Sequence, residues 1–513
     1  MAVPDILVVG AGPTGLTLAL SAHDHGAAVR IVDRRPRAFR PSRALIVHPR
    51  TLEVLRPLGV TAALLDRADT APRARLHLGS RVVTATLAPL DLRDTSFPHL
   101  TLLRQADTEE VLCQALAARG VEVERGTELV DARSEPDHAR AVLRSPDGTT
   151  ECVSSFLAGC DGAASTVRAR AGIRWRASRY AEEVVLADAD LDGDLEGGVA
   201  HVTPGRRGLV FAFPLGEQAP WRLLLTRPAR SDRLPPGYSG PPLAAADLQE
   251  HIDEVGLNVR IERLEWSTTV GLQCSLADRF RQGRLFLAGD AAHTSSPATG
   301  QGMNTGLQDA ANLGWKLAFA AAGGAGSALL DSYSFERRQV ARRVLAVTHL
   351  AFWGEASTAL LPTTLRALAP LAAPVLPAIL RRRWLIGEAI GLVGQLRVGY
   401  HHSPLSVEGT PRPRGGPRPG QRLPDSVVIS GDRRVRVHDL LTRPGIHVLL
   451  DNAADDIDWR GLGSPIDVHR LASAPGHGVT VVRPDGYVGY RCGIVKDQEL
   501  RRWLTCVGVT AIR

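Results

Sequence analysis

The sequence predicts an α/β fold of the Rossmann type into which an antiparallel sheet is inserted, followed by a smaller C-terminal domain. Three apolar strands that lie far apart in the chain each end in a turn rich in Gly or Asp that leads into a helix. Between the second and third of these turns, the pattern changes to short strands separated by Gly and Pro. At 513 residues the chain is too long for a single core, so we expect two or three domains.

The first turn follows the apolar run Ile6–Val9, which is typical of a buried parallel strand. Glycines at 10, 12 and 15 have the spacing that permits a tight turn, a close approach of the backbone to a pyrophosphate, and close packing of helix on strand. Asp33 ends the next predicted strand, where a carboxylate accepts hydrogen bonds from a ribose. This pattern predicts dinucleotide binding without separating NAD from FAD. The contacts we assign to this region are Gly10, Gly12, Pro13, Thr14, Gly15, Asp33 and Arg34.

The second and third turns favour FAD. Asp161 and Gly162 stand where a strand gives way to a helix, although an aspartate in this position is also a common helix cap. Asp290 follows the third strand and is placed to accept a hydrogen bond from a ribityl hydroxyl. The loop from Thr294 to Gly302 leads into a helix whose N-terminal N–H groups would face the edge of a flavin that becomes anionic on reduction.

With these motifs the chain resembles the class A flavoprotein monooxygenases, the aromatic hydroxylase group that includes para-hydroxybenzoate hydroxylase. The resemblance covers residues 1 to about 345. It implies a glutathione-reductase-like FAD-binding domain of the Rossmann type, an inserted antiparallel-sheet substrate domain and a C-terminal thioredoxin-like domain. The further cofactor contacts that it implies are Arg43, Arg104, Gln105, Leu129, Asp161, Gly162, Asp290, Pro297, Gly300, Gln301, Gly302, Met303 and Asn304.

The resemblance also implies a reaction. NAD(P)H reduces FAD, O2 adds at C4a of the reduced flavin, and the hydroperoxide delivers one oxygen atom to an aromatic ring. No catalytic triad is evident, as expected where the cofactor performs the difficult step. The backbone carbonyl of Pro297 is a catalytic candidate, although a rigid loop proline explains it equally well. NADPH is preferred to NADH because Arg43 and its neighbours could meet a 2′-phosphate.

The predicted strands of the substrate domain carry aromatic side chains. Because successive side chains of a strand point to opposite faces, about half of them should face the pocket. Such a lining buries fused rings and leaves few charges to hold a small carboxylate. We therefore expect a polycyclic aromatic substrate of the polyketide or antibiotic type. A small-phenol hydroxylase, a Baeyer–Villiger oxygenase and an FAD-dependent dehydrogenase or reductase of the same fold are the alternatives. The substrate candidates are His48, His201, Phe211, Phe213, Trp221 and Arg222, of which the two histidines and the arginine belong to types that are more often structural.

Domain boundaries follow from changes of pattern and from a Pro- and Arg-rich stretch near residue 415. The tail resembles a thioredoxin-like domain without a redox dithiol, because Cys492 and Cys506 are too far apart, and it is expected to be structural or to support a homodimer. The predicted segments are the FAD-binding domain in two parts (1–178 and, with a helical segment, 273–402), the substrate sheet (179–272), a linker (403–420) and the thioredoxin-like domain (421–513).

Composition argues against several classes of protein. The net charge is +7, but the basic residues are dispersed and are not interleaved with aromatics, so we expect no nucleic acid. Six cysteines show no zinc spacing, and no metal is expected. The most apolar stretch, 358–380, is interrupted by prolines and Arg366, and no signal peptide is visible, so we expect no membrane contact and a cytoplasmic enzyme with reduced thiols.

Overall fold

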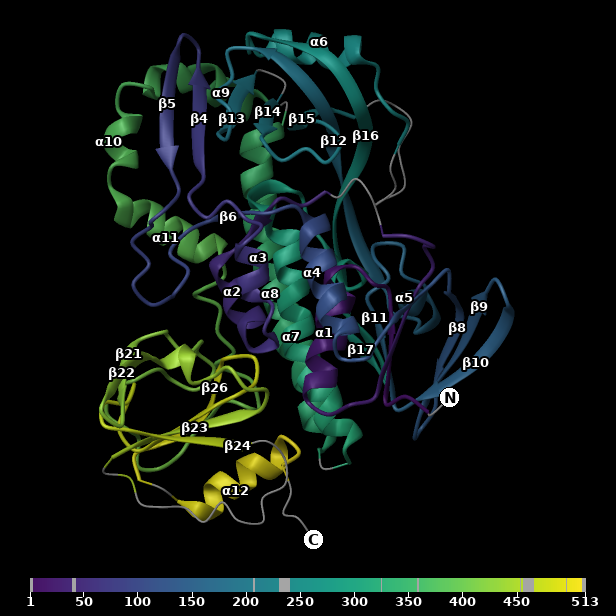
Figure 1. The fold of residues 1–513 in the computed structure, drawn as a ribbon, viewed down its shortest axis with the longest axis vertical. Coiled ribbons are helices and arrows are strands. Elements are labelled where there is room, and N and C mark those ends of the chain that lie inside the picture. The colour runs from purple at the N-terminus through teal and green to yellow at the C-terminus, as the bar shows by residue number, and fades with distance from the viewer. Residues whose placement is uncertain are drawn as a thin grey trace.

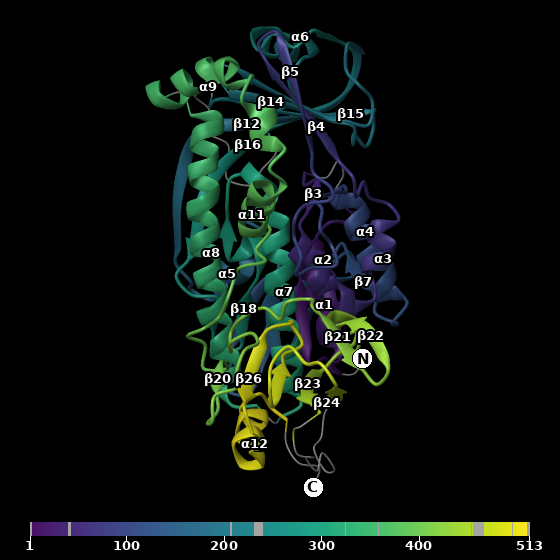
Figure 2. The same ribbon diagram turned by 90° about the vertical axis from the view of Figure 1, so that its left-hand side faces the viewer.

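The computed structural model describes residues 3–38, 43–205, 208–229, 240–323, 325–357, 359–452, 454, 466–494 and 496–509. The molecule is elongated, with a large antiparallel sheet at one end, a Rossmann-type layer in the middle and the C-terminal domain at the other end (Figure 1). Helix α8 (Ser327–Ala356) runs along the long axis and connects these levels (Figure 2). The α/β fold class predicted from the sequence is confirmed.

The central sheet has the strand order β17-β18-β11-β1-β2-β7. Its strands β18, β11, β1, β2 and β7 pair in parallel, and β1, β11 and β18 are wholly buried, which explains their uninterrupted apolar sequences. Because β18, β11 and β1 are neighbours, the three turns that follow them lie side by side at one edge of the sheet. The strands are β1 (Ile6–Val9), β2 (Val29–Asp33), β7 (Val123–Arg125), β11 (Phe156–Gly159), β17 (Arg281–Gln282) and β18 (Leu285–Leu287).

The large sheet has the order β19-β16-β12-β15-β14-β13-β4-β5. Strands β4 and β5 come from the region that the sequence assigned to the FAD-binding domain, so the boundary predicted at residue 178 is wrong for this hairpin. It joins the sheet because β4 pairs in parallel with β13, a long-range contact without a local signal. The strands are β4 (Arg73–Leu78), β5 (Arg81–Thr86), β12 (Trp175–Gly193), β13 (Ala200–Gly205), β14 (Gly208–Phe213), β15 (Trp221–Pro228), β16 (Val259–Ala277) and β19 (His293–Thr294).

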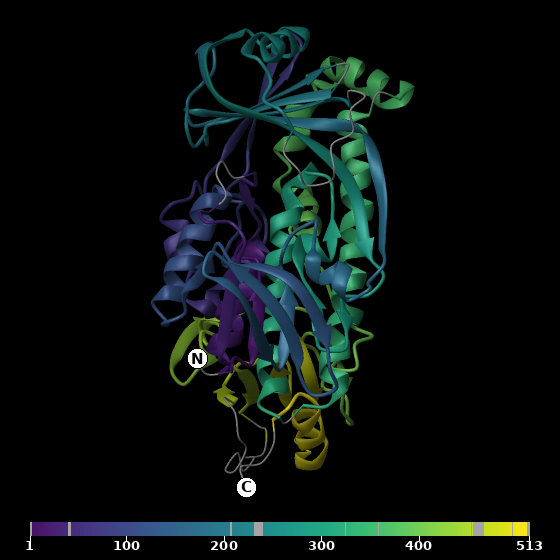
Figure 3. The same ribbon diagram turned by 90° about the vertical axis from the view of Figure 1, so that its right-hand side faces the viewer.

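Helices surround both sheets. Helix α1 (Pro13–Asp24) packs against α7 (Gln301–Ala321), and α6 (Ala245–Glu254) covers one face of the large sheet. A small sheet of β8 (Glu128–Ser134), β9 (Ala139–Ser145) and β10 (Gly148–Ser154) forms the blue strands at the centre of Figure 3. The remaining elements are α2 (Pro49–Leu55), α3 (Thr61–Leu65), α4 (Gln105–Ala117), α5 (Thr166–Arg170), α9 (Leu360–Ala372), α10 (Leu376–Leu380), α11 (Arg383–Val393), β3 (Ile46–Val47) and β6 (Thr101–Leu102).

Within the described residues, no single helix has the length and apolar character needed to cross a membrane. The consecutive helices α8 and α9 reach that threshold only when taken together, and they are bent by 65° relative to each other. Helix α8 buries residues from both ends of its length, as a core helix does.

The C-terminal domain has the sheet order β20-β26-β25-β23-β24. Strands β23 and β24 are parallel, whereas β25 and β26 form an antiparallel hairpin that turns at Gly486, and helix α12 follows. This is a thioredoxin-like arrangement. The elements are β20 (Val407–Glu408), β21 (Val427–Ser430), β22 (Arg433–Arg436), β23 (Ile446–Asp451), β24 (Ile466–Leu471), β25 (Val479–Val482), β26 (Val488–Cys492) and α12 (Asp497–Cys506).

The segment predicted as a linker is part of this domain. Residues 403–420 contain β20, which pairs with β26. Arg491 of β26 donates hydrogen bonds to the carbonyl oxygens of Gly415 and Pro417 at 2.9 and 3.1 Å. The Pro- and Arg-rich composition therefore reflects a segment packed on the domain rather than a free spacer.

Candidate functional site

The first two turns touch each other through their backbones. A Cβ atom on Gly10, whose φ is +103°, would lie 2.4 Å from the carbonyl oxygen of Cys160. A Cβ on Gly15 would lie 1.8 Å from the carbonyl oxygen of Gly10. Both glycines are therefore required because no side chain fits between strand β1, helix α1 and the turn after β11.

The third turn meets the first at Thr14. A Cβ on Gly289 would lie 2.6 Å from Thr14 Oγ1, and a Cβ on Gly306 would lie 2.4 Å from the same atom. Two glycines from separate elements thus allow the end of β18 and helix α7 to approach the start of α1. The three turns recognised in the sequence form one site.

A buried carboxylate fixes the third turn from behind. Asp309 of α7 accepts hydrogen bonds from the backbone N–H of Gly289 (3.1 Å) and from His293 Nε2 (2.7 Å). Arg337 Nε donates to the other oxygen of Asp309 at 2.6 Å. Sequence reasoning missed Asp309 and Arg337, although an aspartate within the apolar run of α7 was a signal that could have drawn attention to it.

The residues at the junction of these turns fit a dinucleotide. Apart from each glycine's own neighbours along the chain, no atom of the described residues lies within 4 Å of a Cβ built on Gly12 or on Gly302, so both backbones face open space. Helix α7 begins at Gln301 behind Gly300, and no side chain caps it. Uncapped N–H groups beside open space suit the phosphates and the polar edge of a flavin.

Asp290 and Arg43 come together in the same place. The Asp290 side chain reaches solvent, although its neighbours Gly289 and Ala291 are buried. Desolvation by the surrounding protein raises the pKa of Asp290, and the charges of His293 and Arg43 act in the opposite direction. Desolvation likewise lowers the pKa of Arg43, opposed by the charge of Asp290. Residues 43 and 290 are therefore electrostatic neighbours, as a shared cofactor site requires.

The expected adenosine end lies at the end of β2. Asp33 accepts hydrogen bonds from the backbone N–H groups of Ala11 and Arg35, both at 2.8 Å. Thr127 N donates to the Asp33 carbonyl oxygen at 3.0 Å, which brings the segment before the buried Leu129 to this position. Arg34 is exposed beside it. The geometry is consistent with the predicted ribose and adenine contacts, which stay predictions.

Arg104 and Gln105, two further predicted cofactor contacts, stand at the start of α4, but their side chains have protein partners. Arg104 binds Asp107 at 2.7 and 3.0 Å, and Gln105 accepts a hydrogen bond from Ala44 N at 3.3 Å. Gln105 therefore lies beside the segment that carries Arg43.

Asp161 acts as a helix cap, which is the second of the two roles that the sequence left open. Its carboxylate accepts hydrogen bonds from Ser165 Oγ (2.6 Å) and from the N–H groups of Thr166 (2.7 Å) and Val167 (3.1 Å) at the start of α5. The adjacent Gly162 has a φ of +80° and open space where a side chain would project. Any contact of this turn with a cofactor therefore involves its backbone more than the aspartate side chain.

The loop before α7 is held by Asn304, whose side chain is fully occupied by protein. It donates to the carbonyl oxygens of Ile46 (2.9 Å) and Gly300 (2.7 Å), and it accepts from His48 N (2.9 Å) and Thr51 Oγ1 (2.7 Å). An amide can make four such bonds, so only the backbone of Asn304 is left for a cofactor.

His48 is wrong as a residue that faces the substrate. Its side chain is buried, and Nε2 lies 3.1 Å from the carbonyl oxygen of Thr299. Desolvation lowers its pKa to about 4, so the ring stays neutral. Thr299 has a φ of +66°, a conformation that costs free energy for a residue with a Cβ. The contact of His48 with the Thr299 carbonyl oxygen helps to hold this conformation.

The other predicted residues of this loop also contact protein. The Pro297 carbonyl accepts a hydrogen bond from Gly300 N at 3.0 Å, as a loop-shaping residue would. Gln301 donates to Thr299 Oγ1 at 3.1 Å, and Met303 packs against the core around α1. The catalytic role of the Pro297 carbonyl stays a prediction.

One face of the large sheet, here called the inner face, turns toward this loop. Val184, Leu186 and Val270 form an apolar cluster with Ala298 of the loop and with Phe352 of α8. Leu186 is paired across the strands with Leu224, and Leu224 with Phe211. The rings of Phe211 and Phe213 are parallel, with centroids 5.9 Å apart. The inner face thus presents an apolar, aromatic surface beside the start of α7.

Arg222 lies on the same face but is closed off by an ion pair. Its guanidinium binds Asp188, with Nη2 at 3.0 Å from Oδ2, and both side chains are completely buried. The backbone N–H groups of Glu217 and Gln218 also donate to Asp188. Arg222 is therefore a structural residue that contacts the inner face and has no exposed surface for a substrate anion.

Trp221 and His201, two of the substrate candidates, lie on the opposite face of the sheet from Phe211 and Phe213. Trp221 packs with Leu223 and Leu225 against α6 on the opposite face of the sheet. His201 pairs with Ala212 across the strands and lies on this same side, here called the outer face. Its Nδ1 atom is 2.9 Å from Nε2 of His77. Alternation along the strands separates these residues from Phe211 and Phe213, although the sequence alone did not show which half faces inward.

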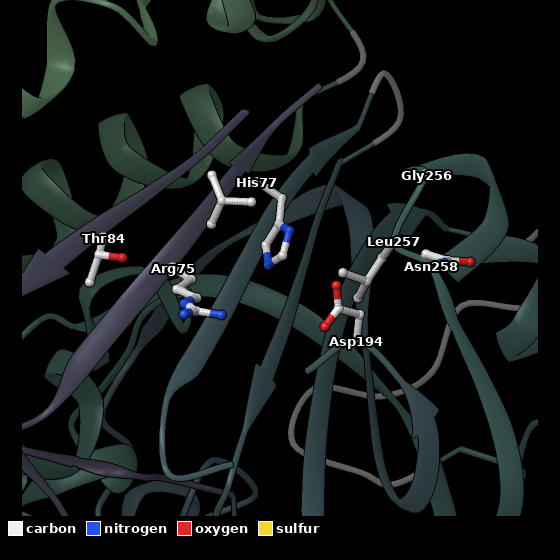
Figure 4. A pocket seen from close by; sticks show the side chains of 8 residues that line it. Arg75, His77, Thr84, Asp194, Gly256, Leu257 and Asn258 are labelled. Atoms are coloured by element: carbon white, nitrogen blue, oxygen red, sulfur yellow. The ribbon is translucent and has the colours of Figure 1, made fainter. Parts of the chain in front are cut away.

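A polar pocket of about 340 Å³ lies on this outer side. Arg75 and His77 of β4 project into it, and Asp194 faces them (Figure 4). Because His77 contacts the outer-face residue His201, the pocket is separated from the three turns by the sheet itself. It is not the site that the turns define.

The converging turns, the start of α7 and the adjacent apolar sheet are the features expected of a flavin-dependent enzyme. A family model described as an FAD binding domain matches residues 4–348, and one described as the C-terminal region of aromatic-ring hydroxylases matches residues 416–507. The chain is 35% identical to 6-methylpretetramide 4-monooxygenase of Streptomyces rimosus over 96% of this chain and 91% of that protein.

Solved structures agree with these matches. An aromatic hydroxylase from angucycline biosynthesis is similar over 100% of both chains, with a TM-score of 0.75 and 27% identity. Aklavinone-11 hydroxylase, in a ternary complex with FAD and aklavinone, is similar over 98% of both chains, with a TM-score of 0.75 and 26% identity. The chain belongs to the family of FAD-dependent aromatic-ring hydroxylases and is a monooxygenase.

Proposed function

We propose that this monooxygenase inserts one oxygen atom from O2 into a multi-ring phenolic or quinone substrate, with NAD(P)H as the reductant. The observation that carries the proposal is the inner face of the large sheet, where Phe211, Leu224 and Leu186 form an apolar row next to the flavin site. The row beside it contains Asp188 and Arg222, which form a buried ion pair with each other. This surface suits fused rings and gives a small carboxylate little to bind.

Bound FAD would supply the activation of O2 and the transfer of one oxygen atom, with electrons from NAD(P)H. The residues of this chain bind and orient. Gly12 would allow the pyrophosphate to approach the backbone, Asp290 would accept a hydrogen bond from the ribityl chain, and the N-terminus of α7 would stabilise negative charge on the flavin. The apolar inner face excludes water from the reacting groups.

The choice between NADPH and NADH does not follow from Arg43. Its charge interacts with that of Asp290, so its position at the flavin site gives no reason to prefer a 2′-phosphate. We therefore propose NAD(P)H as the co-substrate and expect kcat/KM, measured with both nucleotides, to decide.

The substrate class can be tested by the coupling ratio, which is the amount of product formed per NAD(P)H oxidised. Product formed per NAD(P)H oxidised should be high with a three- or four-ring phenol and low with 4-hydroxybenzoate, which would divert electrons to peroxide. Phe213→Ala should lower kcat/KM for the multi-ring substrate about tenfold, whereas Phe335→Ala, which changes a 43% exposed ring on α8, should not. Efficient coupling with hydroxybenzoate alone would overturn the proposal. Fragmentation of the product separates ring hydroxylation from Baeyer–Villiger insertion.

A further inference from the structure

Helix α9 has an apolar side that faces solvent. Leu360, Leu361, Leu365, Leu368 and Leu371 are exposed by 85, 57, 56, 49 and 74% of their surface. Most soluble proteins place polar residues on the solvent face of a helix and bury the apolar stripe. We call this set the α9 leucine face.

The spacing of these residues shows that the face is continuous. Leu361, Leu365 and Leu368 follow one another at intervals of four and three residues, as neighbours on one side of a helix do. Pro362 and Arg366 point the other way and are buried. Arg366 donates to the backbone carbonyl of Gly205 at 3.1 Å, so the polar contact of α9 is directed into the protein and its leucines outward.

The apolar surface continues past α9 and ends in positive charge. Val375 and Ile379 are exposed by 59 and 46%. Arg381, Arg382 and Arg383 follow, all exposed, and none forms an ion pair with a residue that the structure describes. Trp384, next in the chain, is 54% exposed. The sequence contains no Asp or Glu between positions 355 and 388 to balance this charge.

The patch lies at an outer corner of the molecule. Helices α9, α10 and α11 surround the β4–β5 hairpin, and α9 projects from the body beside the large sheet (Figures 1 and 2). Helix α8 leads directly to α9, and its residue Phe352 packs on the inner face with Leu186. The exposed leucines are therefore on the part of the molecule that carries the substrate sheet, distant from the C-terminal domain.

We propose that the α9 leucine face and Arg381–Arg383 dock on the surface of an anionic lipid bilayer. The leucines would enter the boundary between headgroups and acyl chains, the arginines would contact the lipid phosphates, and Trp384 would lie at the interface. The helices are short and interrupted by prolines, so they lie on the bilayer and do not cross it. This departs from the expectation of no membrane contact, which rested on the absence of a spanning segment.

Charge favours a bilayer over a second copy of the chain. A two-fold contact through the same patch would place two uncompensated arginine triplets at one interface. Anionic headgroups supply the missing negative charge instead. The proposal goes beyond the reaction and does not depend on which ring system is oxidised.

The test is co-sedimentation of the full-length, FAD-loaded protein with vesicles of phosphatidylglycerol and phosphatidylcholine, and with vesicles of phosphatidylcholine alone. The protein should bind the anionic vesicles in a salt-sensitive manner. Arg381→Gln/Arg382→Gln/Arg383→Gln should weaken binding about 100-fold, roughly fivefold for each arginine. Leu365→Ser/Leu368→Ser should weaken binding at both low and high salt. Both variants change exposed side chains, so melting temperature and FAD content should match those of the wild type.

A matched control is Val427→Ser/Ile494→Ser, which removes apolar side chains that are 50 and 54% exposed elsewhere and should bind vesicles like the wild type. Equal affinity for neutral and anionic vesicles, or no binding, would overturn the proposal. A dimer in light scattering that Leu365→Ser/Leu368→Ser converts to a monomer, with vesicle binding unchanged, would show that a second copy covers the face.

Discussion

The flavin turns and the C-terminal domain are both attached to the helix pair α7–α8, but by different means. At the N-terminal end of α7, Gly289 and Gly306 leave room for the side chain of Thr14, and the buried Asp309–Arg337 pair holds the turn at Gly289. Farther along the same pair, the C-terminal domain is attached by charged side chains with no exposure to solvent. The first contact depends on missing side chains together with one buried ion pair, whereas the second depends on a larger group of buried ionised side chains.

The charged interface is centred on Glu336 of α8. Its carboxylate accepts hydrogen bonds from Arg483 of the C-terminal domain at 2.7 and 2.9 Å and from Lys316 of α7 at 2.7 Å. Asp485, at the tip of the same hairpin, binds Arg483 and accepts a hydrogen bond from Asn312 at 2.7 Å. Desolvation alone would raise the pKa of Glu336, but Arg483 and Lys316 hold it well below the usual value.

Single substitutions should therefore have different effects at the two interfaces. A side chain added at Gly15 or Gly289 would clash with protein atoms, whereas one added at Gly12 would project toward the space for the cofactor. A buried ion pair is costly to assemble, and removal of one partner leaves a charge uncompensated. The C-terminal domain should therefore be the more sensitive of the two to loss of a single functional group.

The largest effect is expected for Glu336→Gln. The substitution leaves Lys316 buried without its counter-charge and leaves Arg483 paired with Asp485 but not with Glu336, so the free energy of unfolding should fall by about 3–5 kcal/mol. Denaturant titration of the apo-protein measures this. The matched control is Glu388→Gln, which breaks an ion pair with Arg397 in which both partners are more than half exposed and should cost less than about 1 kcal/mol. Equal losses for the two variants would contradict the account of the interface.

The next effect concerns the glycine side of the comparison. Because a Cβ on Gly12 would contact none of the described residues beyond its chain neighbours, Gly12→Val should fold, yet its side chain would occupy the space of the pyrophosphate. The Kd for FAD should rise at least about 100-fold, or about 2.7 kcal/mol, in a fluorescence titration. Gly15→Val, with a Cβ 1.8 Å from the Gly10 carbonyl oxygen, should fail to give folded protein. Full FAD occupancy in Gly12→Val would contradict the location of the site.

The sequence predicts the glycine-built region far better than the charged one. The glycine spacing at 10, 12 and 15 and the aspartates at 33 and 290 are local patterns, because each turn requires particular residues at fixed offsets. Glu336 and Arg483 are 147 positions apart and carry no such pattern. The same limit explains why the pairing of β4 with β13 was missed, and why the sequence left open which of the substrate candidates share a face.

A second glutamate on α8, Glu355, shows what happens to a desolvated carboxyl group that has no positive partner among the described residues. Unlike Glu336, Glu355 forms no ion pair with a described residue, and desolvation raises its pKa to about 7. Between pH 4.5 and about 7 the unfolded chain releases a proton that the folded chain retains, so this group lowers stability as pH rises through that window. Glu355→Gln should therefore raise the melting temperature more at pH 8 than at pH 4.5. An equal shift at both values would show that Glu355 does not titrate in this way.

The smallest effect is expected in the cysteines of the C-terminal domain. All six cysteines of the chain are free, and the buried Cys492 has its Sγ 3.6 Å from the Pro411 carbonyl oxygen. If the domain serves as a packed module rather than a redox relay, Cys492→Ser/Cys506→Ser should keep kcat within about twofold. A large loss of turnover with an unchanged melting temperature would indicate a redox role.

The central claim is that three distant turns hold one flavin and that its chemistry places oxygen from O2 on a multi-ring aromatic substrate. The most direct test is a turnover in ¹⁸O2 with a multi-ring phenol and NAD(P)H, followed by mass spectrometry of the product. The account predicts one labelled oxygen atom in the product for each NAD(P)H oxidised in the coupled reaction. Product that carries oxygen from water, or that forms without consumption of O2, would contradict it.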